Sequence, residues 1–384
     1  MINVAFIPPQ NSTWMGGVNY YQKIFDVMDS NADEFKAYVF VGKKIESDIF
    51  DIYSGYKNIT VVQHALFDRL SIAWFSEKLL ELFFRRSFLL KKILKSHGVN
   101  ILSHATVPKF KCSNIKYIPW VPDLQHLFLP QFFSQKEIKG REKAFKSIFN
   151  HCDKVLVSSL SAKNDLLSHY AIEPANVDVL HFTSSPNVSD VLDIDELKEK
   201  YNIPDKYIYI PNQFWAHKNH KLAFDAIRLL KNRGVNTHLI CTGSTEDTRD
   251  KNYFTGLISG ISDITGNISI LGKIPYRDVV SLVIHSECVL NPSLFEGWST
   301  SVEECKALGK KMILSDIAVH KEQYPDACFF VKDQVESLAD AIEKFSLDSS
   351  SRPSKYDHKD AVNKFSSNYR KILLDLAEVQ KEHI

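Results

Sequence analysis

The sequence lacks the features of a secreted, membrane-spanning or nucleic-acid-binding protein. Its six cysteines are scattered without a C-x-x-C pair, which is typical of reduced thiols in a cytoplasmic protein. No apolar run is long enough to span a bilayer, and we expect no signal peptide. The net charge of +1 gives no overall attraction to nucleic acid, so we expect no nucleic-acid partner.

The sequence also lacks an evident metal-binding cluster. Its D-x-D match, Asp193-Ile194-Asp195, lies in a polar stretch directly before a helical pattern, where an aspartate is typical of a helix cap. We therefore expect no metal and no cofactor.

What the sequence does contain is an alternation of short apolar runs and helical patterns, which indicates parallel α/β units. With 384 residues, 44% of them hydrophobic, the chain can form two cores. In the first half the pattern predicts strands at residues 2–7, 37–41, 59–62, 100–103, 115–121, 154–157 and 177–180. It predicts helices at residues 18–30, 71–96, 135–150 and 161–169.

A polar stretch at residues 182–187 indicates a boundary, after which a second alternating series begins. Its strands are predicted at residues 207–210, 238–240, 268–271, 288–290, 311–314 and 328–331. We expect two Rossmann-like domains facing each other across a cleft, with domains at residues 1–183 and 184–352 and a last helical segment at residues 353–384. Ligands of such sheets bind beyond the carboxyl ends of the strands.

The most specific segment is residues 295–304, FEGWSTSVEE, between a predicted strand and a new helix. Asn291-Pro292-Ser293 is interpreted as the turn that leaves the strand. Thr300-x-x-Glu303 and Ser301-x-x-Glu304 are both acceptable capping boxes. At about 100° per residue, Glu303 points away from the apolar stripe and is predicted to be a solvated cap. Glu304 is placed to face a cleft.

This segment has the chemistry of a sugar-nucleotide site. The amides of a helix start beside the small residue Gly297 can bind a phosphate. The carboxylates of Glu296 and Glu304 repel phosphate but accept hydrogen bonds from vicinal hydroxyls. The alternative is a helix cap beside an ordinary loop.

The stretch FEGWSTSVEECKALGKKMILSD resembles the donor-site signature of the retaining glycosyltransferases of family 4, including the E-x7-E motif. The resemblance implies a GT-B fold with an acceptor-side first domain, a nucleotide-sugar-binding second domain, and a terminal helix that crosses back to the first. It implies that Glu296 contacts the transferred sugar and Glu304 the ribose. The backbone of Gly297, Trp298 and Ser299 would support the sugar and diphosphate.

A second site segment is PNQFWAHKNH, residues 211–220, which joins a strand to a helix. Lys218 lies just before the helix N-terminus, where the macrodipole disfavours a cation by roughly 0.3–1 kcal/mol unless an anion is bound there. In the family this position resembles the lysine that binds the donor diphosphate, usually with an arginine five residues earlier. That earlier position is Gln213 here, so one positive charge is missing. The alternative is a solvent-facing lysine.

Two further segments are interpreted mainly through the resemblance. The Trp14-Met15-Gly16-Gly17-Val18 segment is predicted to be a loop that lets the backbone of Gly16 and Gly17 approach a ligand. It resembles the glycine loop beside the phosphates and acceptor, although taken alone it is more often a turn. Recognition of the base is expected through the backbone near Ile274.

The segment at residues 120–126, WVPDLQH, leaves a strand at its carboxyl end. With the P-x-F-F stretch that follows, it resembles a sugar-polymer, O-antigen-type branch of family 4, where such residues line the acceptor and the reaction centre. Either Asp123 or His126 could take the proton of the acceptor hydroxyl or bind the donor sugar. The alternative is a Pro-Asp turn with a hydrogen-bonded histidine.

Residues 79–95, LLELFFRRSFLLKKILK, combine aromatic and basic side chains in a predicted helix. They could lie on an anionic membrane, which would suit a lipid-linked acceptor. The alternative is a core-facing helix whose long basic side chains extend to solvent.

Together these segments predict a metal-independent retaining glycosyltransferase. It would move a hexosyl or deoxyhexosyl unit, with a mannose-type sugar as first guess, from a nucleoside-diphosphate sugar to a saccharide acceptor in cell-surface polysaccharide synthesis. We expect it in the cytoplasm, at the inner face of the membrane if residues 79–95 bind there. Two alternatives are a noncatalytic nucleotide-sugar-binding scaffold and a peripheral membrane-binding module.

Overall fold

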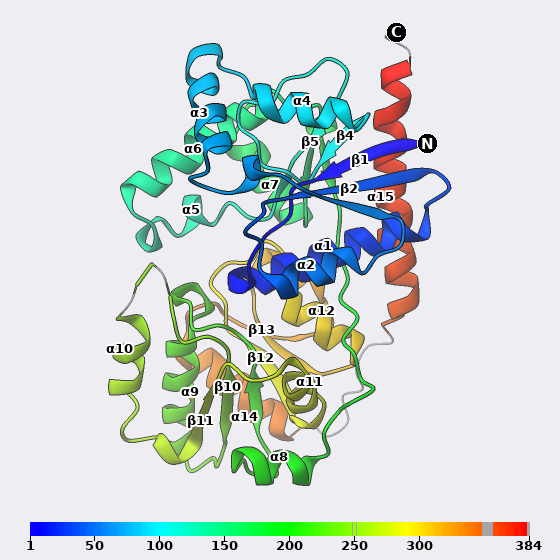
Figure 1. The fold of residues 1–384 in the computed structure, drawn as a ribbon. Coiled ribbons are helices and arrows are strands. Elements are labelled where there is room, and N and C mark those ends of the chain that lie inside the picture. The colour runs from blue at the N-terminus through cyan, green and yellow to red at the C-terminus, as the bar shows by residue number, and fades with distance from the viewer. Residues whose placement is uncertain (248, 251, 348–355, 382–384) are drawn as a thin grey trace. The chain divides into compact units, whose positions relative to one another are not determined.

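The computed structural model describes residues 1–247, 249–250, 252–347 and 356–381. The chain divides into two compact units, coloured along the sequence in Figure 1. Unit 1 comprises Met1–Leu124, Lys136–Thr183 and Lys359–Ile384, and unit 2 comprises Gln125–Gln135 and Ser184–His358. Each unit has its own sheets and core.

Unit 1 contains a five-stranded parallel sheet in the order β3-β2-β1-β4-β5. The central strand places Val4 beside Ala37 on one side and Ile101 on the other. A second parallel sheet has the order β6-β7-β8. The strands are β1 (Ile2–Phe6), β2 (Phe35–Val41), β3 (Ile59–Gln63), β4 (Ile101–Ser103), β5 (Lys116–Ile118), β6 (Trp120–Val121), β7 (Val155–Val157) and β8 (Val177–Val179).

Helices connect these strands, as parallel pairing requires. They are α1 (Met15–Ser30), α2 (Ser47–Ser54), α3 (Ile72–Phe84), α4 (Phe88–Ser96), α6 (Gln135–Phe149), α7 (Leu160–His169) and α15 (His358–Lys381). Short 3-10 turns are η1 (Ser12–Trp14), η2 (Ala65–Phe67) and η4 (Pro174–Asn176).

The single helix predicted at residues 71–96 is wrong, because the chain breaks into α3 and α4. Arg85 ends α3 in the left-handed conformation, with φ of 52°. The Glu77 carboxylate of α3 accepts hydrogen bonds from the backbone amides of Leu89 (2.8 Å) and Leu90 (3.3 Å) in the first turn of α4. Glu77 therefore stabilises the start of the second helix.

Helix α15 packs on unit 1, which confirms the predicted return of the chain end. Tyr369 is fully buried, and its hydroxyl lies 2.8 Å from the Ser103 hydroxyl at the end of β4. Arg370 forms an ion pair with Glu34 in the turn before β2. The last helix therefore completes the core of the first unit.

Unit 2 contains a six-stranded parallel sheet in the order β11-β10-β9-β12-β13-β14. The sheet is of the Rossmann type, because the strand order reverses between β9 and β12. The strands are β9 (Ile208–Ile210), β10 (Leu239–Thr242), β11 (Ile268–Gly272), β12 (Cys288–Asn291), β13 (Met312–Ser315) and β14 (Cys328–Phe330).

The helices of unit 2 are α5 (Gln125–Phe128), α8 (Ile194–Tyr201), α9 (His220–Asn232), α10 (Tyr253–Ser259), α11 (Tyr276–His285), α12 (Thr300–Ala307), α13 (Ala318–Gln323) and α14 (Val335–Leu347). Its 3-10 turns are η3 (Pro130–Phe132), η5 (Ala216–Lys218) and η6 (Thr265–Asn267). Asp193 caps α8 in a capping box with Glu196, which confirms the predicted capping role of the D-x-D match. None of the described helices is long and apolar enough to cross a membrane.

Candidate functional site

The candidate site lies in unit 2, where two neighbouring parallel strands end. Strands β9 and β12 are paired, and the loops that leave their carboxyl ends carry Lys218 and Glu296. The Lys218 Nζ lies 2.6 Å from Glu296 Oε1, and the two side chains are 14% and 9% exposed. The structure therefore brings together two predicted site residues 78 positions apart. This edge of the sheet, at the reversal of strand order, is where ligands of such sheets bind.

Glu296 is held as an ionised carboxylate. Burial alone would raise its pKa, but the charge of Lys218, with contributions from His217 and His320, outweighs burial and lowers the pKa to about 2. The Ser293 hydroxyl also donates a hydrogen bond of 2.6 Å to Oε1. At neutral pH this group can accept hydrogen bonds but has no proton to donate.

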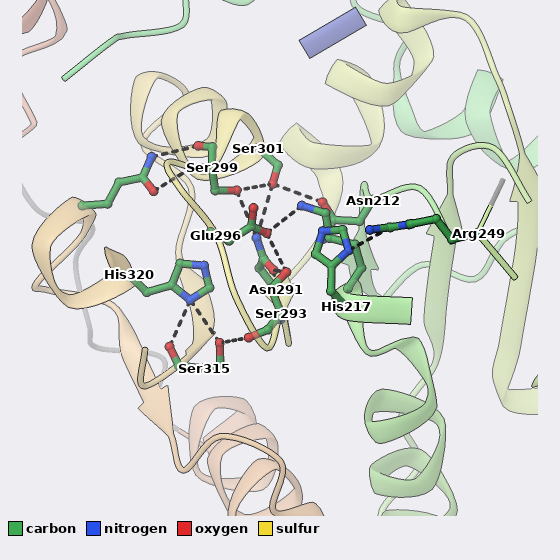
Figure 2. A network of polar contacts seen from close by, with 12 residues as sticks. Asn212, His217, Arg249, Asn291, Ser293, Glu296, Ser299, Ser301, Ser315 and His320 are labelled. Atoms are coloured by element: carbon green, nitrogen blue, oxygen red, sulfur yellow. Dashed lines mark hydrogen bonds and ion pairs between the residues drawn. The ribbon is translucent and has the colours of Figure 1, made fainter. Parts of the chain in front are cut away.

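The loop that carries Glu296 is fixed by a buried asparagine. Asn291, the last residue of β12, has no exposed surface. Its Oδ1 accepts hydrogen bonds from the Ser293 amide (3.2 Å) and hydroxyl (2.6 Å). Its Nδ2 donates to the Ser299 hydroxyl at 3.2 Å. Asn291 thus connects both ends of the loop (Figure 2).

A second asparagine connects this loop to the one that follows β9. The Ser301 hydroxyl donates to Asn212 Oδ1 at 3.3 Å and lies 3.1 Å from the Ser299 hydroxyl. The Asn212 backbone in turn packs against Gly243, which has φ of +129° and where an added Cβ would lie 2.5 Å from the Asn212 carbonyl oxygen. Only glycine fits this close approach.

The start of α12 is positioned from another helix. Ser299 is the N-cap residue, and its amide donates to Gln323 Oε1 at 3.1 Å. Gln323 Nε2 donates back to the Ser299 carbonyl at 2.8 Å. Gln323 ends α13, so this reciprocal pair joins α13 to the first turn of α12.

His320 is a buried histidine beside Glu296. Its Nδ1 lies 3.0 Å from the Ser315 carbonyl oxygen, and the ring lies toward the Glu296 loop in Figure 2. Burial lowers its pKa to about 4, so the ring is neutral at pH 7. Because Nδ1 donates to the carbonyl, Nε2 is left as an acceptor, and it has no hydrogen-bond partner among the described residues.

A second cation reaches the site from the loop after β10. One Arg249 nitrogen lies 3.4 Å from His217 Nδ1, and another donates to Gln125 Oε1 at 2.9 Å. Burial and the charge of Lys218 lower the pKa of His217 to about 3. A neutral His217 therefore separates the positive charges of Lys218 and Arg249.

The structure corrects the predicted position of Glu303, the first of the two adjacent glutamates. Glu303, predicted to be a solvated cap, is 1% exposed. Its carboxylate accepts hydrogen bonds from Lys306 Nζ (2.8 Å), Gln323 Nε2 (2.9 Å) and the Tyr356 hydroxyl (3.3 Å). The predicted capping boxes at Thr300 and Ser301 are also wrong, because α12 begins at Thr300 and its N-cap makes no side-chain cap bond.

Glu304 lies on the accessible side of α12. The Tyr276 hydroxyl donates to its Oε1 at 2.8 Å, and Tyr276 is 45% exposed. Burial raises the pKa of Glu304 to about 7, while the hydrogen bond from Tyr276 acts in the opposite direction. The carboxyl is thus poised to titrate near neutral pH. Ile274, in the loop between β11 and α11, packs against the same core cluster as Val302 of α12.

The remaining predicted residues of unit 2 fall on the two site loops. Gln213 is half-buried in the loop after β9, beside the close approach of Gly243. Gly297 is buried, and the ring of Trp298 has Lys306 Nζ 5.9 Å from its centroid.

The glycines predicted to form a loop in unit 1 lie in a helix. Helix α1 begins at Met15, so Gly16 and Gly17 are part of its first turn. Asn11 explains the earlier start, because its side chain caps the 3-10 turn η1 that leads into the helix.

Asp123 and His126 belong to different units. Asp123 is half-buried in unit 1, with Arg141 Nη1 3.9 Å from its carboxylate. His126 lies in α5 of unit 2, 1% exposed, with its ring centroid 6.4 Å from that of Phe133.

In the part of the chain that is described, no group of three or more histidine, cysteine or acidic side chains is arranged to hold a metal ion. Metal independence stays a prediction.

Sequence reasoning missed most of the polar network that shapes the site. The missed residues are Gln323 and seven residues labelled in Figure 2, namely Asn212, Arg249, Asn291, Ser293, Ser301, Ser315 and His320. The Asn-Pro-Ser signal at residues 291–293 could have identified Asn291 as the residue that orders the loop. No local pattern indicates the partners of Arg249 or Gln323.

Comparisons with known proteins give a family match and similar folds. Residues 193–360 match the family model described as "Glycosyl transferases group 1". No curated protein sequence matches the chain significantly.

Three solved structures illustrate the fold. A glycosyltransferase from Rickettsia africae ESF-5 is 17% identical, with 99% of this chain and 98% of that chain covered and a TM-score of 0.67. Sucrose-phosphate synthase from Thermosynechococcus elongatus is 13% identical, with coverage of 100% and 99% and a TM-score of 0.66. Anabaena HepE in complex with UDP is 12% identical, with coverage of 100% and 98% and a TM-score of 0.64.

The fold is therefore GT-B, and the predicted fold class is confirmed. The family match spans residues 193–360, which include the polar site of unit 2 apart from Gln125, and it supports a glycosyltransferase enzyme.

Proposed function

We propose that this glycosyltransferase moves a hexosyl or deoxyhexosyl unit from a nucleoside-diphosphate sugar to a saccharide acceptor with retention of the anomeric configuration. The observation that carries the proposal is the buried pair of Lys218 and Glu296, 2.6 Å apart at the carboxyl ends of adjacent parallel strands. A cation for the diphosphate and a carboxylate for the sugar hydroxyls are the two groups that such a donor requires.

The diphosphate would lie against Lys218 and the amides at the start of α12. The family arginine is replaced by Gln213, and we assign its charge to Arg249, whose guanidinium reaches His217 next to Lys218. Two cations and a helix start can neutralise a leaving diphosphate without a metal ion.

The transferred sugar would be held by Glu296 and His320. Glu296 is ionised and accepts hydrogen bonds from sugar hydroxyls, as does the free Nε2 of the neutral His320 ring. Neither group needs to change protonation during transfer. The ribose hydroxyls would donate to Glu304 on the accessible side of α12.

In the proposed reaction the bond between the anomeric carbon and the diphosphate oxygen breaks, and a bond to the acceptor oxygen forms on the same face. The acceptor hydroxyl loses its proton, which the departing diphosphate can take. Asp123 and His126 remain the two candidates for orienting that hydroxyl.

The first donors to test are uridine and guanosine sugars. The Anabaena HepE structures hold UDP and UDP-glucose, which favours a uridine nucleotide as one candidate. A guanosine nucleotide that carries a mannose-type sugar is the other candidate, because of the sequence resemblance to the sugar-polymer branch. We propose a cytoplasmic reaction on a saccharide, lipid-linked in the simplest case, for cell-surface polysaccharide synthesis.

The test is thermal unfolding against a panel of nucleoside diphosphates and their sugars, followed by transfer assays with the donor selected. At about 100 times the dissociation constant a ligand adds roughly 2.7 kcal/mol to stability. Lys218→Met should abolish the shift. Lys221→Met is the matched control, because Lys221 lies three residues along on α9 and is 73% exposed. A donor that stabilises both variants equally would refute the proposed diphosphate site.

A further inference from the structure

Helix α3 exposes its apolar side chains and buries its acidic ones. Helix α3 has six exposed large apolar side chains, and the five before Phe84 are Ile72 (87%), Phe75 (54%), Leu79 (57%), Leu82 (69%) and Phe83 (72%). At about 100° per residue these five side chains fall within an arc of about 100°, so they form one continuous face. An amphipathic helix of a globular protein normally turns such a face inward.

The acidic residues of α3 occupy the buried side instead. Glu77 is 4% exposed and accepts from the amides of Leu89 and Leu90, while Glu81 is 8% exposed and accepts from the Ser87 hydroxyl at 2.9 Å. Rotating the apolar face inward would break these bonds and expose the first amides of α4. The outward orientation is therefore built into the contact between the two helices.

The alternative interpretation of residues 79–95, a core-facing helix, does not hold for α3 and holds only for part of α4. Leu90 and Leu94 of α4 are buried in the core of unit 1. Phe84 and Phe88, at the junction of the helices, are 60% and 56% exposed, and their ring centroids lie 5.8 Å apart. Leu70, just before α3, is 67% exposed.

The charges around this face are mainly positive, and of the basic residues Lys78 is paired with Glu81 at 2.7 Å. Residues 69–96 contain seven basic and two acidic residues, and the two acidic residues are the buried Glu77 and Glu81. We define the α3–α4 surface as the exposed apolar side chains above together with these basic residues. The basic residues are Arg69, Lys78, Arg85, Arg86, Lys91, Lys92 and Lys95.

We propose that the α3–α4 surface docks unit 1 on an anionic lipid bilayer; the helices α3 and α4 that carry it are labelled in Figure 1. Aromatic and aliphatic side chains enter the boundary between headgroups and acyl chains, and the basic residues meet the lipid phosphates. The charge distribution selects this occupant. A second copy of the chain would oppose one basic surface with another, whereas an anionic membrane complements both the apolar and the basic groups.

The proposal is independent of the donor site, because it rests on residues 69–96 of unit 1 only. Docking is at the surface, since none of the described helices can cross a membrane.

The test is flotation of the full chain with vesicles of phosphatidylcholine, with and without phosphatidylglycerol. The protein should float with the anionic vesicles, and added salt should release it. Phe83→Ser should lower the partition coefficient by about tenfold, because a buried aromatic side chain is lost from the bilayer. Val331→Ser is the control, since Val331 is 46% exposed but lies in unit 2.

A charge variant separates the two contributions. Arg86→Gln should lower anionic-vesicle binding by about fivefold, because each basic residue near such a surface contributes about that factor. Lys57→Gln, an exposed lysine in unit 1 outside the surface, should leave binding unchanged. Unchanged thermal unfolding would show that these surface variants fold normally.

Two results would overturn the proposal. One is absence of flotation with anionic vesicles, or equal flotation of Phe83→Ser and the parent. The other is a concentration-dependent dimer in sedimentation experiments that Phe83→Ser disrupts while vesicle binding is absent, which would assign the surface to a second copy.

Discussion

Lys218 and Glu296 form a buried ion pair between the loops that follow β9 and β12, with Nζ and Oε1 2.6 Å apart. In the proposed complex these same groups bind opposite ends of the donor, Lys218 the diphosphate and Glu296 the sugar. Without donor, each neutralises the other, so neither charge is left buried alone. The pair therefore keeps the empty site stable in an arrangement close to the one that the donor requires.

Breaking this pair should destabilise the protein in a pH-dependent way. Lys218→Met is expected to lower the free energy of unfolding by about 3–5 kcal/mol at pH 7, because Glu296 is left buried without its cation. At pH 4 the loss should be smaller, since the uncompensated carboxyl can then be protonated. Urea unfolding at the two pH values measures both effects, and Lys221→Met provides the baseline.

In the parent protein, the stability that the Lys218–Glu296 pair contributes decreases as the pH falls. The pKa of Glu296 is lowered to about 2, so the pair contributes its full stability above the unfolded-state value of about 4.5 and loses it as the pH falls toward 2. A loss in Lys218→Met that is as large at pH 4 as at pH 7 would contradict this account.

Substitution of Glu303 should mainly affect the stability of the protein, whereas substitution of Glu304 should mainly affect donor binding. Glu303→Ala is expected to lower the free energy of unfolding by about 3 kcal/mol, because Lys306 and Gln323 lose a buried partner. Glu304→Ala should leave unfolding nearly unchanged but weaken binding of the nucleotide sugar by about tenfold, the effect of one hydrogen-bonded charge. Denaturant titration and calorimetry measure the two quantities. Parent-like donor affinity in Glu304→Ala would refute the ribose assignment.

Donor affinity should depend on pH through Glu304. Its pKa is raised to about 7, so the carboxylate that accepts ribose hydrogen bonds is incompletely ionised at neutral pH. Affinity should therefore increase from pH 6 to pH 8, and Glu304→Gln should flatten the profile. An intact nucleotide sugar is the required ligand, because its diphosphate diester does not titrate in this range. A profile that is the same in both proteins would mean that another group titrates.

Arg249 should supply the charge that Gln213 lacks. Arg249→Gln is expected to weaken donor binding by about tenfold, as loss of a charge-assisted hydrogen bond would. Adding Gln213→Arg to that variant should restore part of the affinity by returning a cation to the other position. Binding of UDP and GDP to the single and double variants measures the effect. No loss in Arg249→Gln would exclude this arginine from the diphosphate site.

Gly243 should not tolerate a side chain. In Gly243→Ala the new Cβ would clash with the Asn212 backbone at an unfavourable φ of +129°, which is expected to cost about 3 kcal/mol of stability. Gly256→Ala is the matched control, because Gly256 lies within α10 with no atom within 4 Å of an added Cβ. It should stabilise the protein by about 0.5–1 kcal/mol. Thermal unfolding of both variants measures these two changes in stability.

Local sequence patterns located most strands and the two site loops, but the single strand predicted at residues 115–121 is wrong, because it divides into β5 and β6 of different sheets. The buried strands are short apolar runs between helical patterns, and parallel sheets place the loops after β9 and β12 at one edge. For that reason Lys218 and Glu296 could be assigned to one site without knowing their distance. The cap of α8 was equally local, because Asp193 and Glu196 lie within one turn.

The orientation of Glu303 could not be read from its own helix. Helical periodicity turns this residue away from the apolar stripe, which suggests solvent. Its partners Gln323 and Tyr356 are 20 and 53 residues away, and they make that side of α12 polar but buried. The buried side of helix α3 could not be predicted for a related reason. The amides at the start of α4 bind Glu77 on the inner side, which leaves the aromatic residues outside.

The course of the backbone between the units has a consequence for protein engineering. The chain divides into five segments, three in unit 1 and two in unit 2. A fragment that ends at Thr183 would lack α15, and with it the buried Tyr369 that contacts Ser103. A hybrid enzyme that takes its donor half from another glycosyltransferase must therefore exchange residues 125–135 together with residues 184–358, and keep the native α15 with the native first half.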